Sequence, residues 1–524
     1  MTYMKNLGIT AILGAFAVGA VACGDDDDPE PSGTGGTMAT TPTTTTANGG
    51  NGAGGMTAGD TIADVAAAED DLTILLAAAT AAGLDTDLAN PDVNLTVFAP
   101  TDGAFVQALT DLGVTQDALL GNVPLLTAIL QYHILASEVF ASAITEPSAQ
   151  SSANGFAIFV APDAGTVDIN GGSVMLTNGG ATVTEADLDA SNGVIHKIDR
   201  VLLPPDLVSL ARYATDSGVA GFADLQQALV DAGLAGNFSV DLLTADLANI
   251  PQSTLFAPTD DVFPDGVTDP AILGPILSYH VVDGAAVGSD AIDFPAAPTM
   301  RTVEYNEDGA MRVVPLSLLF DTSGSDVVIN GGSAATGPFD GTTPATIDES
   351  PAGAEVVVAD LRAVNGIAHV VNNVLMPLNV AEVAARGGFT ELVNAVGGAS
   401  DISGGGPVLE ALGESSGITV FAPTDMAFMG ASLGTPTADQ LRDVLLLHVV
   451  PGPLPVLSGN LPGNTTDAVG TLLTGGELNF DAAAMPPTVT VAGTTNALLP
   501  AGIAVVDIGA ENGVVHVIDQ VLTN

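Results

Sequence analysis

The sequence predicts an α+β fold organised as three tandem domains of similar architecture. Three short sequence markers recur in the same order three times, at a spacing of about 150 residues. In each copy, apolar residues first repeat every three or four positions, as in helices, and β-branched segments with Asn-Gly and Gly-Gly pairs follow later. Because solenoid repeats have periods of only ~20 to 50 residues, each copy is expected to fold around its own core.

The three copies divide the chain into predicted domains at 60–204, 205–377 and 378–524. Each is expected to begin with helices, because the apolar residues between Thr61 and Leu84 are spaced at three and four. The middle copy is longer, and its extra residues, about 333–354, are rich in Gly, Pro, Thr and Asp. This composition is typical of a surface loop.

The first marker reads TVFAPTD, TLFAPTD and TVFAPTD in the three copies. Its β-branched part predicts a strand that ends at the proline, and the Thr-Asp pair predicts the N-cap and first-turn acid of a helix. The candidate residues are Thr101, Asp102, Thr259, Asp260, Thr424 and Asp425.

The second marker lies at the end of an apolar, helix-like run and contains a histidine in every copy. The apolar spacing places this histidine on the apolar face of the helix, near its end, where the ring can form hydrogen bonds. The third copy has Leu447 where the others have tyrosine. The marker residues are Tyr132, His133, Tyr279, His280 and His448.

The third marker is an Asn-Gly pair followed three residues later by histidine, preceded in every copy by an aspartate five positions before the asparagine. Asn-Gly favours a turn because glycine and asparagine tolerate positive φ, and the apolar residues beyond it predict a final strand. The residues concerned are Asn192, Gly193, His196, Asn365, Gly366, His369, Asn512, Gly513 and His516.

The first 59 residues are expected to lie outside the folded part. Residues 1–22 combine Lys5 with an apolar stretch and small residues, which predicts a signal peptide that is removed on export. Cys23 follows Ala-Val-Ala and resembles the lipobox of bacterial lipoproteins, so it is the predicted lipidation site. A signal peptide cut without lipidation is the alternative. Residues 23–59, rich in Asp, Gly and Thr, predict a disordered tether.

These features predict an exported protein, lipid-anchored to the bacterial membrane or cell surface, with a secreted or periplasmic protein as the alternative. With one cysteine the chain has no disulfide, and its stability must come from packing. Beyond the signal peptide no stretch is long and apolar enough to span a bilayer, so membrane contact is expected only through the lipid.

The charge of the chain excludes nucleic acid as a partner. Nine basic residues against 61 acidic ones give a net charge of -52, which a phosphate backbone would repel. The acidic surface is interpreted as a solubility feature. Weak binding of divalent cations that bridge the protein to polysaccharide or to another acidic copy is the alternative.

With its three motifs, each present three times, the chain resembles the fasciclin, or FAS1, domain family. The resemblance implies a compact α+β fold in each domain, a β-wedge or sandwich packed with several α-helices. It also implies a role in extracellular adhesion or matrix interaction, and no enzyme activity. An extracellular protein, a cell surface or a polysaccharide is then the expected partner.

All six histidines lie in the markers, two per copy, which raises the alternative of a metal or acid-base site with the nearby aspartates. No His-x3-His or cysteine pair would place two ligands on one helix face. The marker residues are therefore interpreted as structural, with no catalytic residue, metal or cofactor assigned. Three functions are considered: adhesion first, then a periplasmic or secreted module that binds a small molecule or glycan, and last a hydrolase.

Overall fold

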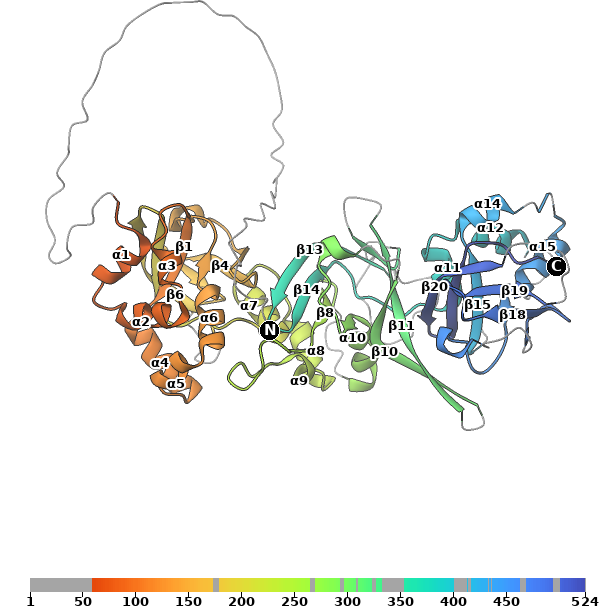
Figure 1. Ribbon diagram of the computed structural model, residues 1–524, viewed down its shortest axis with the longest axis horizontal. Helices are drawn as coiled ribbons and strands as arrows, with labels where there is room; N and C mark the ends of the chain where they lie inside the picture. The colour runs from red at the N-terminus through yellow and green to blue at the C-terminus, as the bar shows by residue number, and fades with distance from the viewer. Residues whose placement is uncertain are drawn as a thin grey trace, which may run out of the picture.

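The computed structural model describes residues 59–172, 179–263, 269–292, 296–307, 310–322, 327–331, 353–399, 412, 416–431, 433–434, 436–461, 468–492 and 500–523. Signal peptide, Cys23 and all but the last residue of the predicted tether lie outside the described residues. The same holds for the predicted insertion up to residue 352. Three similar α+β bodies follow one another in a row (Figure 1), which confirms the predicted fold class.

The elements of the first body alternate helices with strands before a β-rich second half. They are α1 (Ile62–Ala68), α2 (Thr73–Ala82), α3 (Asp85–Leu88), β1 (Leu95–Pro100), α4 (Asp102–Leu112), α5 (Gln116–Gly121), α6 (Val123–Tyr132), β2 (Ile134–Leu135), the 3-10 helix η1 (Ala141–Ala143), β3 (Ser148–Ser151), β4 (Ala157–Asp163), β5 (Thr166–Ile169), β6 (Ala181–Ala190) and β7 (Gly193–Ile198).

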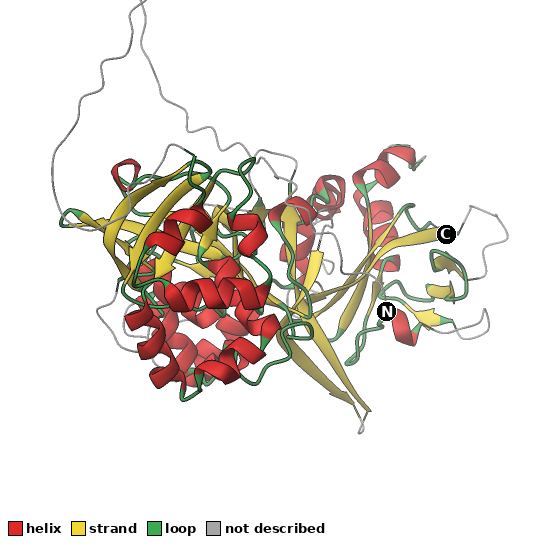
Figure 2. Cartoon of the chain, turned by 60° about the vertical axis from the view of Figure 1, so that its left-hand side comes forward, coloured by secondary structure: helices red, strands yellow, loops and turns green. Residues whose placement is uncertain are grey.

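The second body repeats this order with a long hairpin formed by β10 and β11, which extends beyond the rest of the domain (Figures 1 and 2). Its elements are α7 (Leu207–Asp216), α8 (Ala223–Asp231), α9 (Ala235–Phe238), β8 (Ser253–Pro258), α10 (Pro270–Tyr279), β9 (Val281–Asp283), η2 (Ser289–Ala291), β10 (Ala296–Glu307), β11 (Ala310–Asp321), β12 (Val328–Ile329), β13 (Ala354–Ala363) and β14 (Gly366–Val371).

The third body has the same plan with shorter strands at one sheet edge. Its elements are α11 (Val380–Arg386), α12 (Thr390–Ala399), β15 (Ile418–Pro423), α14 (Asp425–Gly430), α15 (Ala438–Leu447), β16 (Val449–Val450), η3 (Ser458–Asn460), β17 (Val469–Gly470), β18 (Glu477–Asp481), β19 (Thr488–Val491), β20 (Ala501–Ala510) and β21 (Gly513–Ile518).

Each body contains a seven-stranded mixed sheet with one strand order. In the first it is β2-β1-β7-β6-β5-β4-β3, and the other two follow the same path. The strand of the first marker, β1, pairs in parallel with the strand of the last marker, β7, and antiparallel with the short β2. The remaining neighbours are antiparallel. Strands from the first and last parts of the domain, β1 and β7, therefore lie side by side in the sheet.

Two hydrophobic clusters lie on opposite sides of the central strands. In the first domain, Val97 of β1 packs with the helices α1 to α6, whereas its neighbour Phe98 faces a second cluster between the strands. The helices gather on one side of the strands (Figure 2). Alternating side chains of one fully buried strand thus serve two cores, as expected for a period of two residues.

Candidate functional site

The three markers of each domain meet on neighbouring strands. In the first domain Phe98 of β1 lies opposite His196 of β7 in the parallel pair, and Val97 lies opposite Ile134, the residue after His133. The pairing repeats in the other domains, where Phe256 faces His369 and Phe421 faces His516. The predicted site residues are therefore brought together, one group per domain.

The histidine of the second marker has both ring nitrogens bonded to backbone groups. His133 is the C-cap residue of α6, and its Nδ1 lies 2.7 Å from the carbonyl oxygen of Ile129, to which it donates. Its Nε2 accepts the backbone N–H of Leu202 at 2.9 Å. The equivalent contacts join His280 to Ile276 (2.9 Å) and Leu375 (2.8 Å), and His448 to Val444 (2.8 Å) and Leu522 (2.9 Å).

Burial keeps these three rings neutral. Desolvation lowers the pKa of His133, His280 and His448 to about 4, against a smaller opposing effect of the carbonyl that each ring bonds. A second proton on Nε2 would also point at a backbone N–H and break that hydrogen bond. The neutral ring therefore joins the end of the helix to the chain beyond the last strand through hydrogen bonds. It carries no positive charge that would interact with the helix dipole.

The histidine of the third marker shows the opposite arrangement of donor and acceptor. Nδ1 of His196 accepts the backbone N–H of Asp187 at 3.2 Å, and Nε2 donates to the carbonyl of Val139 at 2.8 Å. Desolvation lowers the pKa of His196, while the Val139 carbonyl and Asp187 act in the opposite direction. The same contacts join His369 to Asp360 (3.2 Å) and Val287 (2.9 Å), and His516 to Asp507 (3.1 Å) and Val456 (2.8 Å).

The aspartate that opens the third marker has a specific backbone conformation. Asp187 adopts φ 60°, the left-handed region that few residues other than glycine enter. Its carboxylate accepts the N–H of Ala141 at 2.8 Å at the start of η1. Asp360 (φ 62°) and Asp507 (φ 59°) make the same contact to Ser289 and Ser458, each at 2.8 Å. The sequence motif includes these aspartates, but their conformation was not foreseen.

The Thr-Asp pair of the first marker caps two helices. Thr101 accepts the N–H of Ala104 and is the N-cap of α4, as predicted, and Thr424 caps α14 in the same way. For Thr259 the structure gives backbone bonds from Val262 and Phe263 to its carbonyl. The aspartate does more than occupy the first turn, because Asp102 accepts the N–H of Ile74 at 2.7 Å and so caps α2.

The same contact recurs in the other two domains. Asp260 accepts the N–H groups of Ala223 (3.1 Å) and Asp224 (3.0 Å) at the start of α8, and Asp425 accepts that of Glu391 (2.8 Å) at the start of α12. In the first and third domains the aspartate thus joins the helix after the first strand, α4 or α14, to an earlier helix. The predicted helix does not form at Asp260, which lies in a turn after β8 and joins that turn to α8. The N-cap residues of α2 and α8 make no side-chain cap of their own.

The Asn-Gly pair differs from its predicted role. The two-residue turn between β6 and β7 consists of Ser191 and Asn192, and Gly193 is already the first residue of β7. Asn192 is buried, and its amide accepts the N–H of Ile62 and donates to the carbonyls of Leu88 and Asn90. Asn365 and Asn512 likewise accept the first N–H of α7 and α11, from Leu207 and Val380.

The glycine after this asparagine is required for close packing of the two marker strands. A Cβ atom on Gly193 would lie 1.9 Å from the carbonyl oxygen of Leu95, and on Gly366 2.0 Å from that of Ser253. The Asn-Gly dipeptide therefore joins three parts of the domain. Asn192 bonds the start of α1, and Gly193 lets β7 pack closely against β1. A local turn rule identifies the turn but not these partners, which lie 98 residues from Gly193 and 102 to 130 residues from Asn192 in the chain.

The tyrosine of the second marker is not a surface residue. Tyr132 is fully buried, donates its hydroxyl to the carbonyl of Ala157 at 2.8 Å and accepts the amide of Asn170 at 3.1 Å. Tyr279 does the same with Ser317 (2.8 Å) and Asn330 (3.1 Å). Burial raises the pKa of both hydroxyls, which remain neutral hydrogen-bonding groups.

The marker histidines offer no free ring nitrogen to a metal or a substrate. Within the described residues there is also no group of three or more His, Cys, Asp or Glu side chains that could hold a metal ion. Cys23, the predicted lipidation site, lies outside these residues. No helix among them is long and apolar enough to cross a membrane.

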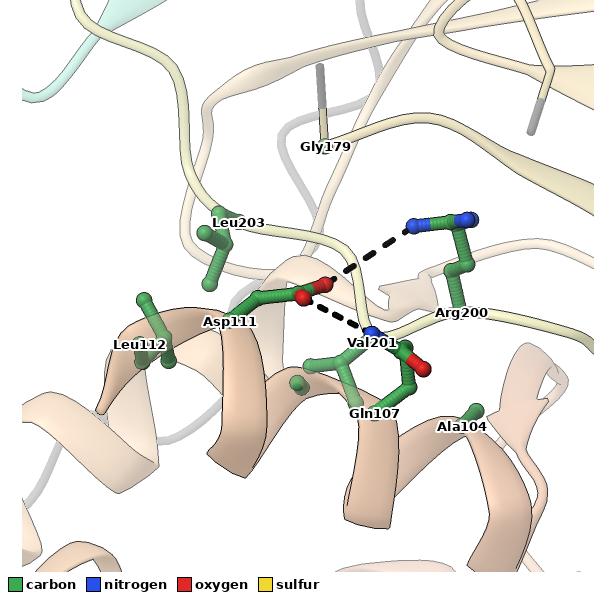
Figure 3. A pocket seen from close by; sticks show the side chains of 9 residues that line it. Ala104, Gln107, Asp111, Leu112, Gly179, Arg200, Val201 and Leu203 are labelled. Atoms are coloured by element: carbon green, nitrogen blue, oxygen red, sulfur yellow. Dashed lines mark hydrogen bonds and ion pairs between the residues drawn. The ribbon is translucent and has the colours of Figure 1, made fainter. Parts of the chain in front are cut away.

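One cavity in the first domain has polar side chains that are not part of the markers. It has a volume of about 230 Å³ and lies between α4 and the chain that follows β7 (Figure 3). Arg200 and Asp111 approach each other across it, 3.9 Å between Nη1 and Oδ2, and Gln107 donates to the same carboxylate at 2.7 Å. An adjoining cavity of similar size shares Leu112, Gly179 and Leu203 and extends to the second domain.

Comparison with known proteins decides the family. The sequence model of the Fasciclin domain matches residues 70–204, 220–377 and 389–524. The chain belongs to the fasciclin family. The resemblance found from the three motifs is thereby confirmed, and each fasciclin domain corresponds to one of the three seven-stranded bodies.

Several fasciclin relatives are similar to parts of the chain. Transforming growth factor-beta-induced protein ig-h3 of Sus scrofa is 32% identical over 212 residues, covering 40% of this chain and 27% of its own. Protein sll1483 of Synechocystis sp. is 38% identical over 146 residues (28% and 74%), and human periostin 30% over 227 residues (43% and 24%). The chain thus spans about a quarter of the ig-h3 protein.

A solved FAS1 domain pair from the insect cell adhesion molecule fasciclin I also aligns with this chain. The alignment covers 58% of the fasciclin chain described here and 94% of the solved one, with 17% sequence identity and a TM-score of 0.33.

Proposed function

We propose that this fasciclin protein is a non-enzymatic adhesion or matrix-interaction protein that acts outside the cell. One observation supports it above the others: all six histidines of the repeated markers have both ring nitrogens bonded to backbone groups. The repeated residues therefore have structural roles in the three domains, and partners bind to the exposed surfaces of these domains. Membership of the fasciclin family and the net charge of -52 are consistent with a soluble, extracellular scaffold.

The proposal includes the organisation of the chain. Residues 1–22 are the signal peptide, Cys23 carries the lipid, residues 23–59 form the tether, and domains at 60–204, 205–377 and 378–524 stand beyond it. Metabolic labelling with a fatty acid tests the anchor: the wild-type chain is expected to become labelled and Cys23→Ser to remain unlabelled. Label on the variant, or none on the wild type, would refute the anchor.

Binding is tested with the exported chain carrying Cys23→Ser, so that no lipid confounds the result. The protein is applied to intact cells and to an array of extracellular polysaccharides and matrix proteins, with and without calcium. Saturable binding to one class of surface is expected. Binding that requires calcium would support cation bridging by the acidic surface, and no saturable binding in either condition would refute the adhesion proposal.

The second candidate is a module that binds a small molecule or glycan, and the cavity of Figure 3 favours it. Arg200, Asp111 and Gln107 could form hydrogen bonds with a small polar ligand there. Arg200→Gln should then abolish binding of a soluble saccharide, whereas Arg442→Gln, which removes an exposed ion pair with Asp439 in the third domain, should not. Equal binding by both variants would exclude this cavity.

A further inference from the structure

The first two domains meet through apolar side chains of β4, of which Phe159 is the largest and Ala157 lies in the same cluster. Strand β4 of the first domain contacts α7 and β13 of the second. Phe159 on this strand is fully buried, and it belongs to the same hydrophobic cluster as Ala214 of α7 and Val370 of β14. Its side chain therefore completes the core of the following domain rather than that of its own.

The second and third domains meet through an equivalent side chain and through further contacts of the β10–β11 hairpin, where Tyr305 and Val314 share an apolar cluster with Val514 and Tyr305 donates to the carbonyl of Glu511 at 3.0 Å. Strand β11 contacts β20, and Leu319 of β11 belongs to the cluster that contains Val517 of β21. Leu319 and Phe159 occupy equivalent positions, because the N–H of each donates to a buried asparagine, Asn330 or Asn170, at 3.0 Å. We call Phe159 and Leu319 the knobs, and Val370 and Val517 the sockets.

The asparagines that bond the knobs also shape the contact. Asn170 and Asn330 both have φ 52°, and the marker tyrosines bond their amides. The glycine that follows lies against the next domain, because a Cβ on Gly171 would meet Asp216 at 2.2 Å and one on Gly331 would meet Arg386 at 3.2 Å. Arg386 in turn donates to the carbonyl of Asn330 at 3.2 Å.

The third domain lacks every part of the knob. Val489 pairs with Ala501 as Ile169 pairs with Ala181, and Phe480 pairs with Val489 as Val160 pairs with Ile169. This register places Asn479 at the knob position. Thr490 then stands where the first two domains have asparagine, and Leu447 where they have tyrosine. Asn479 is half-buried.

The first domain lacks the socket. In the strand pairs, Lys197 lies opposite Ala99 where Val370 and Val517 lie opposite Ala257 and Ala422. The Lys197 side chain is 6% exposed, and its Nζ lies 2.6 Å from Glu69, 3.0 Å from Asp71 and 3.1 Å from Glu185. A buried ammonium with three carboxylates leaves no apolar site for an incoming knob.

We propose that the knob and socket residues join consecutive fasciclin domains of this chain. We also propose that polar residues at the same positions prevent another domain from joining the first or the third. Asn479 ends the row after the third domain, and Lys197 with its carboxylates ends it before the first. A head-to-tail contact between copies would use different surfaces on the two partners and could continue without limit. The polar ends keep the three-domain row a single unit.

The joining role is tested by removing one knob at a time from the full chain with Cys23→Ser. Spin labels on introduced cysteines, Asp117→Cys, Gln227→Cys and Thr474→Cys used in pairs, report the distances across the two junctions. Leu319→Asn should broaden only the distance distribution between positions 227 and 474, and Phe159→Asn only that between 117 and 227. Unchanged distributions in both variants, or equal broadening at both junctions, would overturn the proposal.

The role of the polar residues is tested by replacing them with the apolar residues that the second domain has at the same positions. Asn479→Leu copies the second domain's knob. The triple variant Glu69→Ala, Glu185→Val, Lys197→Val copies its socket Val370 together with Ala214 and Val358, the residues equivalent to Glu69 and Glu185. Each variant alone should sediment as a monomer, and their mixture as a one-to-one dimer. A wild-type chain that self-associates end to end, or a mixture of folded variants that stays monomeric, would contradict this role.

If the triple variant fails to fold, the wild-type sedimentation and the two knob variants still decide the proposal. Arg386→Ala provides a further measurement, because it removes the contact to the Asn330 carbonyl from the side of the third domain. It should broaden the distribution between 227 and 474 without lowering the melting temperature of the second domain. An unchanged distribution would count against the described junction.

Discussion

Nε2 of His133 accepts the backbone N–H of Leu202 at 2.9 Å, which joins the end of a helix in the middle of the first domain to the chain beyond its last strand. Leu202 follows the final marker by only a few residues, and its own side chain is fully buried in the cluster between the strands. The contact requires the neutral ring, because the accepting nitrogen must carry no proton. This makes the fold sensitive to acid.

Stability is expected to fall between pH 7 and pH 5 because of His133, His280 and His448. Their pKa in the folded chain is about 4, below the ordinary 6.5, so as the pH falls the unfolded chain binds protons first. Their contribution is complete above pH 6.5 and is lost towards pH 4. The loss is roughly 2 kcal/mol per histidine between pH 7 and pH 5. NMR of the imidazole nitrogens checks this, and titration of these rings near pH 6.5 would contradict it.

Gly193→Ala should destabilise the first domain by about 3 kcal/mol or more. The new Cβ would lie 1.9 Å from the Leu95 carbonyl oxygen and force β1 and β7 apart. Gly121→Ala is the matched control, since nothing lies within 4 Å of its added Cβ at the end of α5, and it should be neutral or slightly stabilising. Thermal unfolding of both full-length variants measures the difference. Equal melting curves would show that the strand pair is not as close as described.

Asn192→Ala should cost about 3 kcal/mol, because it leaves the N–H of Ile62 and the carbonyls of Leu88 and Asn90 without their amide partner. Ser191→Ala, one residue earlier in the same turn, removes only an exposed bond to the Gly59 carbonyl and should cost under about 0.5 kcal/mol. Chemical denaturation gives both values. A reversed order would indicate that the turn, not the buried amide, is the stabilising element.

Asp102→Ala should destabilise the first domain by about 1 to 2 kcal/mol through the loss of the cap on α2. Its carboxylate also accepts the hydroxyl of Thr73 at 2.6 Å. Asp117→Ala, which removes a first-turn acid of α5, tests whether charge alone explains the effect and should cost under about 1 kcal/mol. Hydrogen exchange of the Ile74 amide follows the cap directly, and unchanged protection in Asp102→Ala would exclude it.

A chelator should leave the melting temperature unchanged, and Zn²⁺ should not titrate the histidines. Both nitrogens of rings such as His196 already bond the backbone, so a metal would have to break a hydrogen bond to Asp187 or Val139. Calorimetry with Zn²⁺, compared between the wild type and His196→Gln, provides the measurement. A binding event lost in the variant would restore the metal hypothesis.

Most of the architecture was predictable because the three markers repeat and each has local structural content. A strand ending at Pro100 and the cap at Thr101 follow from neighbouring residues alone. The roles of Asn192 and Asp102 did not follow, since their partners lie 130 and 28 residues away and no periodicity reports such contacts. The sequence alone also gives no reason for Lys197 and Asn479, because the effect of a polar residue at these positions depends on whether another domain packs against it.

The parallel pairing of β1 with β7 sets the order in which a newly made domain can be completed. Leu95 to Pro100 are synthesised almost 100 residues before Gly193 to Ile198, their neighbours in the sheet. A chain is synthesised from its N-terminus, so the first half of each domain must wait, with one side of its central strand unpaired, until the last strand has been made. Closing such a distant contact is slow relative to forming helices. Folding therefore proceeds domain by domain, each finished by its own final residues.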